Sequence, residues 1–326
     1  MLLLSRNDIK SIFSMTDSIE AVKEAFVLFS EGKVKVPLRG AIKAENGGVF
    51  VAMPAFSEEL GYHCVKQVNH FPQNIDKGLP TLPAQILLSQ AEDGMIVALL
   101  DGLYVTQLRT GASSGAAFSV LAKETCHKGA LIGTGAQAAT QLEAMVCARQ
   151  LDEVYIYDLN AERLNAFVAN ANREFAAYGA KFVAARSSDE AVDGADLLIT
   201  MTPSKKPVFD GRRLMPGATV SCVGSFMPDM QELSPYALTR ASKLFFDSQE
   251  AVLSESGDVL IPLHEGLITE CLFAGDLGDV IQGKKVGREN DDEIIVYKTV
   301  GIGAQDLVAS KAIYERALAA GVGMNW

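Results

Sequence analysis

The chain has 326 residues, of which 48% are hydrophobic and 21% charged, as is typical of a folded globular protein. This length is near the upper limit for one hydrophobic core, so two domains are expected. Aspartate and glutamate total 40 against 29 lysines and arginines, and the formal net charge of −11 disfavours nucleic acid as a partner. No apolar run reaches the roughly 18 to 20 residues that a membrane helix needs, so we expect a cytoplasmic protein without a membrane partner.

Cysteines and histidines give no sign of a disulfide framework or a metal site. The five cysteines are odd in number and scattered, and no two of them form a C-x-x-C pair. The four histidines are dispersed too, without the short ligand spacing of zinc or iron sites. We therefore expect reduced thiols and no bound metal.

The N-terminal segment predicts a mostly antiparallel sheet with one helix. That helix follows Asp17, a candidate N-cap with Glu20 three residues further on, and carries an apolar stripe on one face. Residues 48–101 then form short β-prone runs cut by proline and glycine. Within them, residues 87–100 have an Asp-Gly pair near the centre and predict a hairpin.

A helix rich in glycine, alanine and serine is expected over residues 103–122. From Thr110 to Ala117 its side chains are small enough to admit either another backbone or a ligand, and both interpretations stay open.

After this helix the pattern becomes a regular alternation of strands and helices, which predicts parallel βαβ units in a doubly wound, Rossmann-type α/β sheet. The expected strands cover residues 129–132, 153–157, 181–184, 196–200, 219–223 and 243–246, and the expected helices cover 137–150, 161–178 and 189–192. A last helix, over 306–319, is expected to pack back on the first domain. The predicted domains are a substrate and dimerisation domain, 1–118 with 304–326, and a dinucleotide domain, 119–303.

A glycine-rich turn follows the first strand of this alternation and opens a helix. Gly133 permits the tight turn, Gly135 lets a pyrophosphate approach the backbone, and Ala138 is small enough for the helix to pack on the strand. The helix N-terminus offers unpaired N–H groups to phosphates. The turn predicts a nicotinamide dinucleotide site formed by Gly133, Thr134, Gly135, Ala136, Gln137 and Ala138.

An acidic residue, Asp158, ends the next strand, where the dinucleotide fingerprint places one. A carboxylate there accepts hydrogen bonds from the adenosine ribose and repels a 2′-phosphate, so NAD(H) is expected in preference to NADP(H). The alternative is a surface aspartate that caps the following helix. Arg163 lies nearby and leaves NADP(H) possible as a second cofactor.

Two further strand ends lie at the carboxyl edge of the predicted sheet, where ligands of open α/β sheets bind. The residues expected to border the nicotinamide are Thr200, Thr202, Val223, Gly224 and Ser225, and Thr110 of the small-residue helix is a further expected cofactor-binding residue. Ordinary turn chemistry is the alternative, because these residue types are common wherever strands end.

Three cations lie in apolar settings in the first domain: Arg39, Lys66 and Arg109. A buried cation without a partner is costly, so each should meet a protein carboxylate or a bound anion. Singly, each is more often a structural salt bridge. Together beside a dinucleotide, they predict a clamp for a substrate carboxylate.

Across nearly its whole length the sequence resembles the ornithine cyclodeaminase/mu-crystallin family. The resemblance rests on an ordered set of motifs: Pro37-Leu38-Arg39, Met53-Pro54-Ala55, Val65-Lys66-Gln67-Val68-Asn69, Gly78-Leu79-Pro80-Thr81, Leu108-Arg109-Thr110-Gly111-Ala112, residues 132–138, Val223-Gly224-Ser225 with Gln231-Glu232-Leu233, and Tyr297-Lys298-Thr299-Val300-Gly301.

The resemblance implies a dinucleotide domain inserted between the halves of a substrate and dimerisation domain, and a homodimer. It also implies that Arg39, Lys66 and Arg109 hold an amino- or imino-acid carboxylate. Thr81 lies beside them in the family, and the last motif adds Gly301 to the expected substrate residues.

Departures from the family pattern argue against cyclodeamination. Phe226 stands where ornithine cyclodeaminases carry an aspartate that handles the substrate amino group. Nearby Asp229 matches the mu-crystallin-like and imine-reductase branch, and Met53 stands where cyclodeaminases have an acidic residue. Losing both carboxylates leaves no evident base for deaminating a diamine.

The resemblance and these departures together predict an enzyme that uses NAD(P)H to reduce a cyclic imino acid, Δ1-pyrroline-2-carboxylate or Δ1-piperideine-2-carboxylate. Arg109 is expected to hold the carboxylate during catalysis, and Lys66 either to relay a proton or only to neutralise the carboxylate. The alternatives are an alanine-type or opine-type amino-acid dehydrogenase, an ornithine cyclodeaminase, and a crystallin-like protein that binds a dinucleotide without catalysis.

Overall fold

The computed structural model describes residues 1–37 and 39–326. The chain divides into two compact units: unit 1 comprises Met1–Arg109 with Ile302–Trp326, and unit 2 comprises Thr110–Gly301. The predicted domain boundaries fall after residues 118 and 303, whereas these units divide after Arg109, inside helix α3 (Gly102–Leu121), and after Gly301. In the described part of the chain, no helix is both long and apolar enough to cross a membrane.

Unit 1 is built on a seven-stranded sheet in the order β15-β1-β6-β5-β4-β3-β2. Among the described strands of this sheet, β1 and β6 pair in parallel and the other neighbours are antiparallel. The predicted hairpin is confirmed as β5 and β6, with Gly94 in the left-handed region at φ 74°. The strands are β1 (Leu2–Leu4), β2 (Gly40–Lys43), β3 (Val49–Ser57), β4 (Tyr62–His70), β5 (Ala84–Gln90), β6 (Ile96–Asp101) and β15 (Met324–Asn325).

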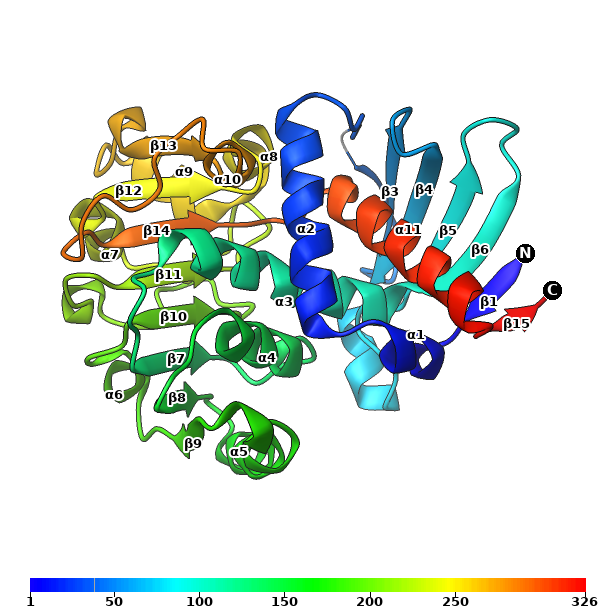
Figure 1. Ribbon diagram of the computed structural model, residues 1–326. Helices are drawn as coiled ribbons and strands as arrows, with labels where there is room; N and C mark the ends of the chain where they lie inside the picture. The colour runs from blue at the N-terminus through cyan, green and yellow to red at the C-terminus, as the bar shows by residue number, and fades with distance from the viewer. Residues whose placement is uncertain (38) are drawn as a thin grey trace. The chain divides into compact units, whose positions relative to one another are not determined.

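The described helices of unit 1 include α1 (Arg6–Ile12), α2 (Met15–Ser30), α11 (Gly303–Ala320) and the first part of α3, as far as Arg109. Helix α11 packs on α2 and on strands β3, β4 and β5, which confirms that the last helix returns to the first domain (Figure 1). The predicted N-cap of α2 is wrong by one turn. Ser14 is the cap and Asp17 is its capping-box partner, because the hydroxyl of Ser14 accepts from the Asp17 backbone N–H.

Unit 2 is an eight-stranded sheet in the order β13-β12-β14-β11-β10-β7-β8-β9, and every neighbouring pair is parallel (Figure 1). Its strands are β7 (Lys128–Ile132), β8 (Glu153–Tyr157), β9 (Lys181–Ala184), β10 (Leu197–Thr200), β11 (Thr219–Cys222), β12 (Lys243–Phe246), β13 (Phe273–Asp276) and β14 (Ile295–Lys298). Its helices include α4 (Ala138–Ala148), α5 (Ala161–Glu174), α6 (Ser188–Val192), α7 (Pro235–Arg240), α8 (Gln249–Glu255), α9 (Gly257–His264) and α10 (Leu277–Ile281).

Both faces of the unit 2 sheet are covered. Along β10, Leu198 belongs to one hydrophobic cluster, while Leu197 and Ile199 belong to another. A parallel sheet buried on both faces is the doubly wound arrangement that the sequence predicts.

Candidate active site

In unit 1, two buried cations share one carboxylate. Lys66 Nζ lies 2.6 Å from Asp306 Oδ2, and Arg109 Nε lies 3.1 Å from Asp306 Oδ1. Lys66 comes from β4, Arg109 from α3 and Asp306 from the first turn of α11. All three side chains are buried, so the two cations depend on Asp306, and Asp306 on them, rather than on water.

The positions of these charges follow from strand register. Lys66 is paired with Met53 on β3 and with Ile86 on β5, and both neighbours are buried. Directly opposed residues share one face of a sheet, so Lys66 is a cation within an apolar row. Helix α11 packs on these same strands and brings Asp306 to that cation.

Burial and mutual attraction shift the ionisation of this cluster. Burial, followed by repulsion from Arg109, lowers the pKa of Lys66 to about 8 against the attraction of Asp306. Burial alone would raise the pKa of Asp306, but Lys66 and Arg109 attract and hydrogen-bond its carboxylate and keep that pKa below its usual value. At neutral pH the three groups therefore carry two positive charges and one negative charge, and the surplus favours an anion.

Two neighbours add to the cluster. Arg39 is half-buried, and its charge is one of the causes that lower the pKa of Lys66. Gln305 is buried, and its Oε1 accepts from Arg109 Nη1 at 3.3 Å and from the Ile302 backbone N–H at 3.0 Å. Thr81, the fourth predicted residue of this group, is half-buried in the loop before β5.

From the sequence, each buried cation was expected to meet either a protein carboxylate or a bound anion, and Asp306 was not identified as the carboxylate that Lys66 and Arg109 meet. The available signal was the segment Gly-Ala-Gln-Asp-Leu-Val-Ala, in which one acid stands among small and apolar residues at the start of a helix. A charge in such a stretch is expected to be buried, and a buried charge needs a partner of opposite sign.

The residues by which the sequence departs from the cyclodeaminase pattern lie in both units. Met53 is the direct strand partner of Lys66, so an acid at that position would lie beside the Lys66 ammonium group. In unit 2, Phe226 is half-buried, and Asp229 is exposed and pairs with Lys205 at 2.6 Å.

The glycine-rich turn lies between β7 and α4 in unit 2. Gly133 has φ 105°, and a Cβ added there would lie 2.5 Å from the carbonyl oxygen of Met201, so only glycine fits. At Gly135 an added Cβ would meet no protein atom within 4 Å, so the protein itself does not require a glycine. Ala138 is fully buried at the first turn of α4. These features fit a dinucleotide whose pyrophosphate lies against Gly135 and the N-terminus of α4.

Asp158 follows β8, and protein donors already occupy its carboxylate. Oδ2 accepts from the Thr134 backbone N–H at 2.8 Å and from the Thr134 hydroxyl at 2.7 Å. Oδ1 accepts from the Asn160 backbone N–H at 2.8 Å and from Arg163 Nη2 at 2.6 Å. Burial opposes this ionised form, but these hydrogen bonds outweigh it and lower the Asp158 pKa. Asp158 is thus buried rather than a surface residue, and Asn160 is the helix cap.

The Asp158–Arg163 pair makes the choice between NADH and NADPH testable. The Arg163 side chain is 52% exposed, so it can leave Oδ1 free for a ribose hydroxyl or turn its guanidinium to a 2′-phosphate. We expect Arg163→Ala to raise the NADH-to-NADPH ratio of kcat/KM about tenfold, because the phosphate loses a charge-assisted hydrogen bond. Steady-state kinetics with both cofactors measure the ratio. Arg173→Ala, an exposed arginine on the same helix, should leave it unchanged.

The strand ends predicted to border the nicotinamide lie side by side in the sheet, since Thr200 on β10 is in register with Cys222 on β11. Thr200 and Thr202 both donate to the carboxylate of Glu232 through their hydroxyls, at 3.2 and 2.8 Å. The Gly224 backbone N–H donates to the same carboxylate at 2.7 Å. Glu232 is thus a central residue of this edge, although its place in the segment Gln231-Glu232-Leu233 gives no sign of that role.

Three other predicted residues of unit 2 have protein partners. The buried hydroxyl of Ser225 donates to the carbonyl of Met230 at 2.8 Å. The Thr110 carbonyl accepts from Gln141 Nε2 at 3.0 Å. Gly301 has φ 79°, and its N–H donates to Asp247 Oδ2 at 2.6 Å. Val223, the residue before Gly224, is half-buried.

The fold and these residues define a class: an α/β protein with a glycine-rich turn at a helix N-terminus in one unit and a buried cation cluster in the other. The family model described as the ornithine cyclodeaminase/mu-crystallin family matches residues 1–321. The chain belongs to this family.

One named relative and two solved structures are similar to this chain over nearly its whole length. A Δ1-pyrroline-2-carboxylate reductase of Bacillus cereus is 37% identical over 99% of this chain and 98% of its own. The structure of the Thermococcus litoralis Δ1-pyrroline-2-carboxylate reductase, in complex with NADH and L-proline, is 38% identical with a TM-score of 0.95 over 100% of both chains. An archaeal alanine dehydrogenase dimer with bound NAD is 34% identical, with a TM-score of 0.91 over 99% of this chain and 98% of that chain.

Proposed function

We propose that this protein is an NAD(P)H-dependent reductase that converts a cyclic imino acid, Δ1-pyrroline-2-carboxylate or Δ1-piperideine-2-carboxylate, to L-proline or L-pipecolate. The observation that carries the proposal is the buried cluster in which Lys66 and Arg109 share the single carboxylate of Asp306. A surplus cation in a buried setting suits a small substrate that carries one carboxylate. The similarity to reductases named for the five-membered substrate supports the same reaction.

In this function unit 2 binds the cofactor through the turn at residues 133–138 and Asp158, and NADH supplies a hydride for the imine carbon when bound. Unit 1 binds the substrate carboxylate through Arg109, with Lys66, Arg39 and Thr81, and the proposed set also includes Gly301, which belongs to unit 2. Arg109 presents a planar pair of donors that matches a carboxylate, so it fixes the orientation of the substrate.

Lys66 is the proposed source of the proton for the imine nitrogen. With a pKa of about 8 it is protonated at neutral pH, yet it releases a proton more readily than an exposed lysine. The balance is one hydride to carbon and one proton to nitrogen, which converts the C=N bond to an amine. We expect the reduction rate to fall above about pH 8, as Lys66 loses the proton that both attracts the carboxylate and protonates nitrogen.

The function is tested by NADH and NADPH oxidation with a panel of five- and six-membered cyclic imines, pyruvate with ammonia, and ornithine with NAD. We expect proline or pipecolate to form in step with NADH oxidation, and no ammonia from ornithine. Turnover of pyruvate with ammonia in place of the imines would establish the alanine dehydrogenase alternative. A protein that binds NADH but oxidises it with none of these substrates would refute an enzymatic role.

Cyclodeamination is disfavoured by the residue beside Lys66. Met53 is its strand partner and carries no charge, so nothing at that position neutralises Lys66 or binds a second ammonium group. Phe226 likewise offers no carboxylate after β11. The site therefore favours a substrate whose only charged group besides the imine is its carboxylate.

A second copy of the chain is the proposed partner, bound through the face of the unit 1 sheet opposite α11. Residues in register across five strands form an apolar row on that face: Leu3, Leu99, Leu87, Val65 and Pro54. They alternate along their strands with residues buried on the α11 side, and Leu87 is 37% exposed. A row of this kind is self-complementary across a two-fold axis. The similarity to the dimeric alanine dehydrogenase supports the homodimer.

Leu87→Glu tests this partner. A charge at the centre of an apolar interface has to be desolvated on association, so we expect the variant to run as a single chain. Sedimentation equilibrium gives the mass in solution. Leu318→Glu, an exposed leucine on α11 away from the row, should keep the mass of two chains. A Leu87→Glu protein that still associates would exclude this face.

A further inference from the structure

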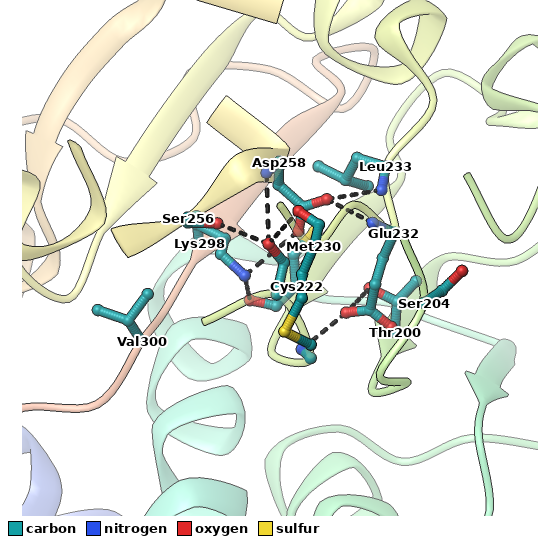
Figure 2. Close-up of polar contacts among 12 residues, drawn as sticks. Thr200, Ser204, Cys222, Met230, Glu232, Leu233, Ser256, Asp258, Lys298 and Val300 are labelled. Atoms are coloured by element: carbon teal, nitrogen blue, oxygen red, sulfur yellow. Dashed lines mark hydrogen bonds and ion pairs between the residues drawn. The ribbon is translucent and has the colours of Figure 1, made fainter. Parts of the chain in front are cut away.

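Glu232 is buried in unit 2, where it joins the ends of two neighbouring strands (Figure 2). Its Oε1 accepts from the backbone N–H of Thr202 and from the Thr202 hydroxyl. Its Oε2 accepts from the Gly224 backbone N–H at 2.7 Å and from the Thr200 hydroxyl at 3.2 Å. One carboxylate thus ties the loop after β10 to the loop after β11.

The arrangement requires an ionised carboxylate. The two backbone N–H groups donate to different oxygens, and an amide side chain would offer an oxygen to only one of them. The loops also press closely on this group, because a Cβ added at Gly224 would lie 2.5 Å from Glu232 Oε2 and 2.3 Å from the Thr202 carbonyl oxygen. A buried N–H left without an acceptor costs about 1 to 3 kcal/mol, so the carboxylate holds both loops in place.

A second layer fixes Glu232 itself (Figure 2). Asp258 Oδ1, from α9, accepts the backbone N–H groups of Glu232 at 2.6 Å and Leu233 at 2.8 Å. Lys298 Nζ lies 3.3 Å from Asp258 Oδ2 and donates to the Cys222 carbonyl at 3.2 Å. Cys222 and Lys298 are in register as the last residues of β11 and β14. The network therefore spans the carboxyl ends of three adjacent strands.

We propose that Glu232 is a positioning residue for the nicotinamide half of the dinucleotide, acting through the loops of Thr202 and Gly224. The carboxyl ends of parallel strands are where open α/β sheets bind their ligands, and Glu232 sets the backbone of two such ends. The inference rests on the proposed use of NAD(H) but not on the identity of the imine. Glu232 itself does not touch the cofactor in this role.

The charges around Glu232 make the role sensitive to pH. The groups that face it are Asp258 on α9, Lys298 on β14 and the Cys222 thiol on β11, which burial keeps neutral by raising its pKa well above the usual value. Burial, followed by repulsion from Asp258, raises the Glu232 pKa to about 7 against the attraction of Lys298 and the donors of Thr202. Acidification through this range protonates Glu232 and removes an acceptor, so NADH affinity should fall on the acid side.

The experiment compares Glu232→Gln with the wild type in the absence of substrate. NADH titration monitored by fluorescence should show about tenfold weaker binding, since one backbone N–H loses its acceptor. In the cofactor-free protein, amide hydrogen exchange should become faster at Thr202 and Gly224. The acid-side loss of NADH affinity, centred near pH 7 in the wild type, should disappear. Glu174→Gln, an exposed glutamate of the same unit, is the control.

Asp258→Asn provides a second test if the glutamine variant folds poorly. It removes the repulsion that raises the Glu232 pKa, so the acid limb of NADH affinity should move to lower pH. The inference about Glu232 would be overturned, and the proposed function would not, if Glu232→Gln left NADH affinity and amide hydrogen exchange unchanged. The same holds if the acid limb of NADH affinity did not move in Asp258→Asn. A wild-type protein that fails to bind NADH would instead overturn the proposed function.

Discussion

Replacing Arg109 by alanine is expected to lower kcat/KM for the cyclic imine by about 10²-fold to 10³-fold, the range for truncating one member of a buried, hydrogen-bonded charge pair. Arg109 is the guanidinium of the unit 1 cluster, and Lys66 and Asp306 pair directly with each other without it. The variant therefore keeps a neutral buried pair and loses the surplus charge that attracts the substrate. Steady-state kinetics with NADH and the imine measure the loss.

The same variant should bind NADH as the wild type does, because the dinucleotide turn lies in unit 2 and Arg109 belongs to unit 1. NADH titration is thus the internal control for folding. Arg6→Ala, an exposed arginine of unit 1, should leave both kinetics and NADH binding unchanged. Retained turnover in Arg109→Ala would remove this residue from the site.

The unit 2 sheet was largely predictable because each βα repeat is a local pattern. β7, β8, β9, β10 and β12 lie within about one residue of their predicted positions. Strand β14 was not predicted, although it occupies the centre of the sheet between β11 and β12. Like β13, which was also not predicted, β14 follows the last predicted strand of the regular alternation, and its place in the sheet depends on pairing with distant strands. Strand β15 is missed for the same reason.

The candidate site was predictable to the extent that its chemistry is visible in one segment. A glycine-rich turn reveals itself by spacing, and Lys66 by its position in a β-prone apolar run. Asp306, the partner of Lys66, is 240 residues further along the chain, and only the packing of α11 on the sheet brings the two side chains together. The role of Glu232 cannot be recognised from one segment either, because its carboxylate accepts hydrogen bonds from two loops that meet at the sheet edge. A sequence shows which charges need partners, but only the folded chain shows which residues pair.

Asp306→Asn is expected to be the most damaging substitution for stability in unit 1, with a loss of about 3 to 5 kcal/mol in the free energy of unfolding. Asp306 is fully buried and accepts from Lys66 and Arg109 on different oxygens. An asparagine keeps one acceptor oxygen and turns an amide donor toward the other cation. Denaturant unfolding at neutral pH measures the loss, and Lys311→Met, a half-buried lysine on the same helix, is the control.

The variant should also change the pH dependence of turnover. Attraction to Asp306 opposes the burial that lowers the Lys66 pKa, so its loss should move the pKa below about 8 and the alkaline limb of the pH profile to lower pH. Lys66→Met combined with Asp306→Asn separates stability from function. Removing the Lys66 ammonium leaves one buried cation, Arg109, without its carboxylate instead of two, so part of the stability should return, while turnover should stay low without the Lys66 proton. If Asp306→Asn is as stable as the wild type and its pH profile does not move, Asp306 does not hold the two cations in place.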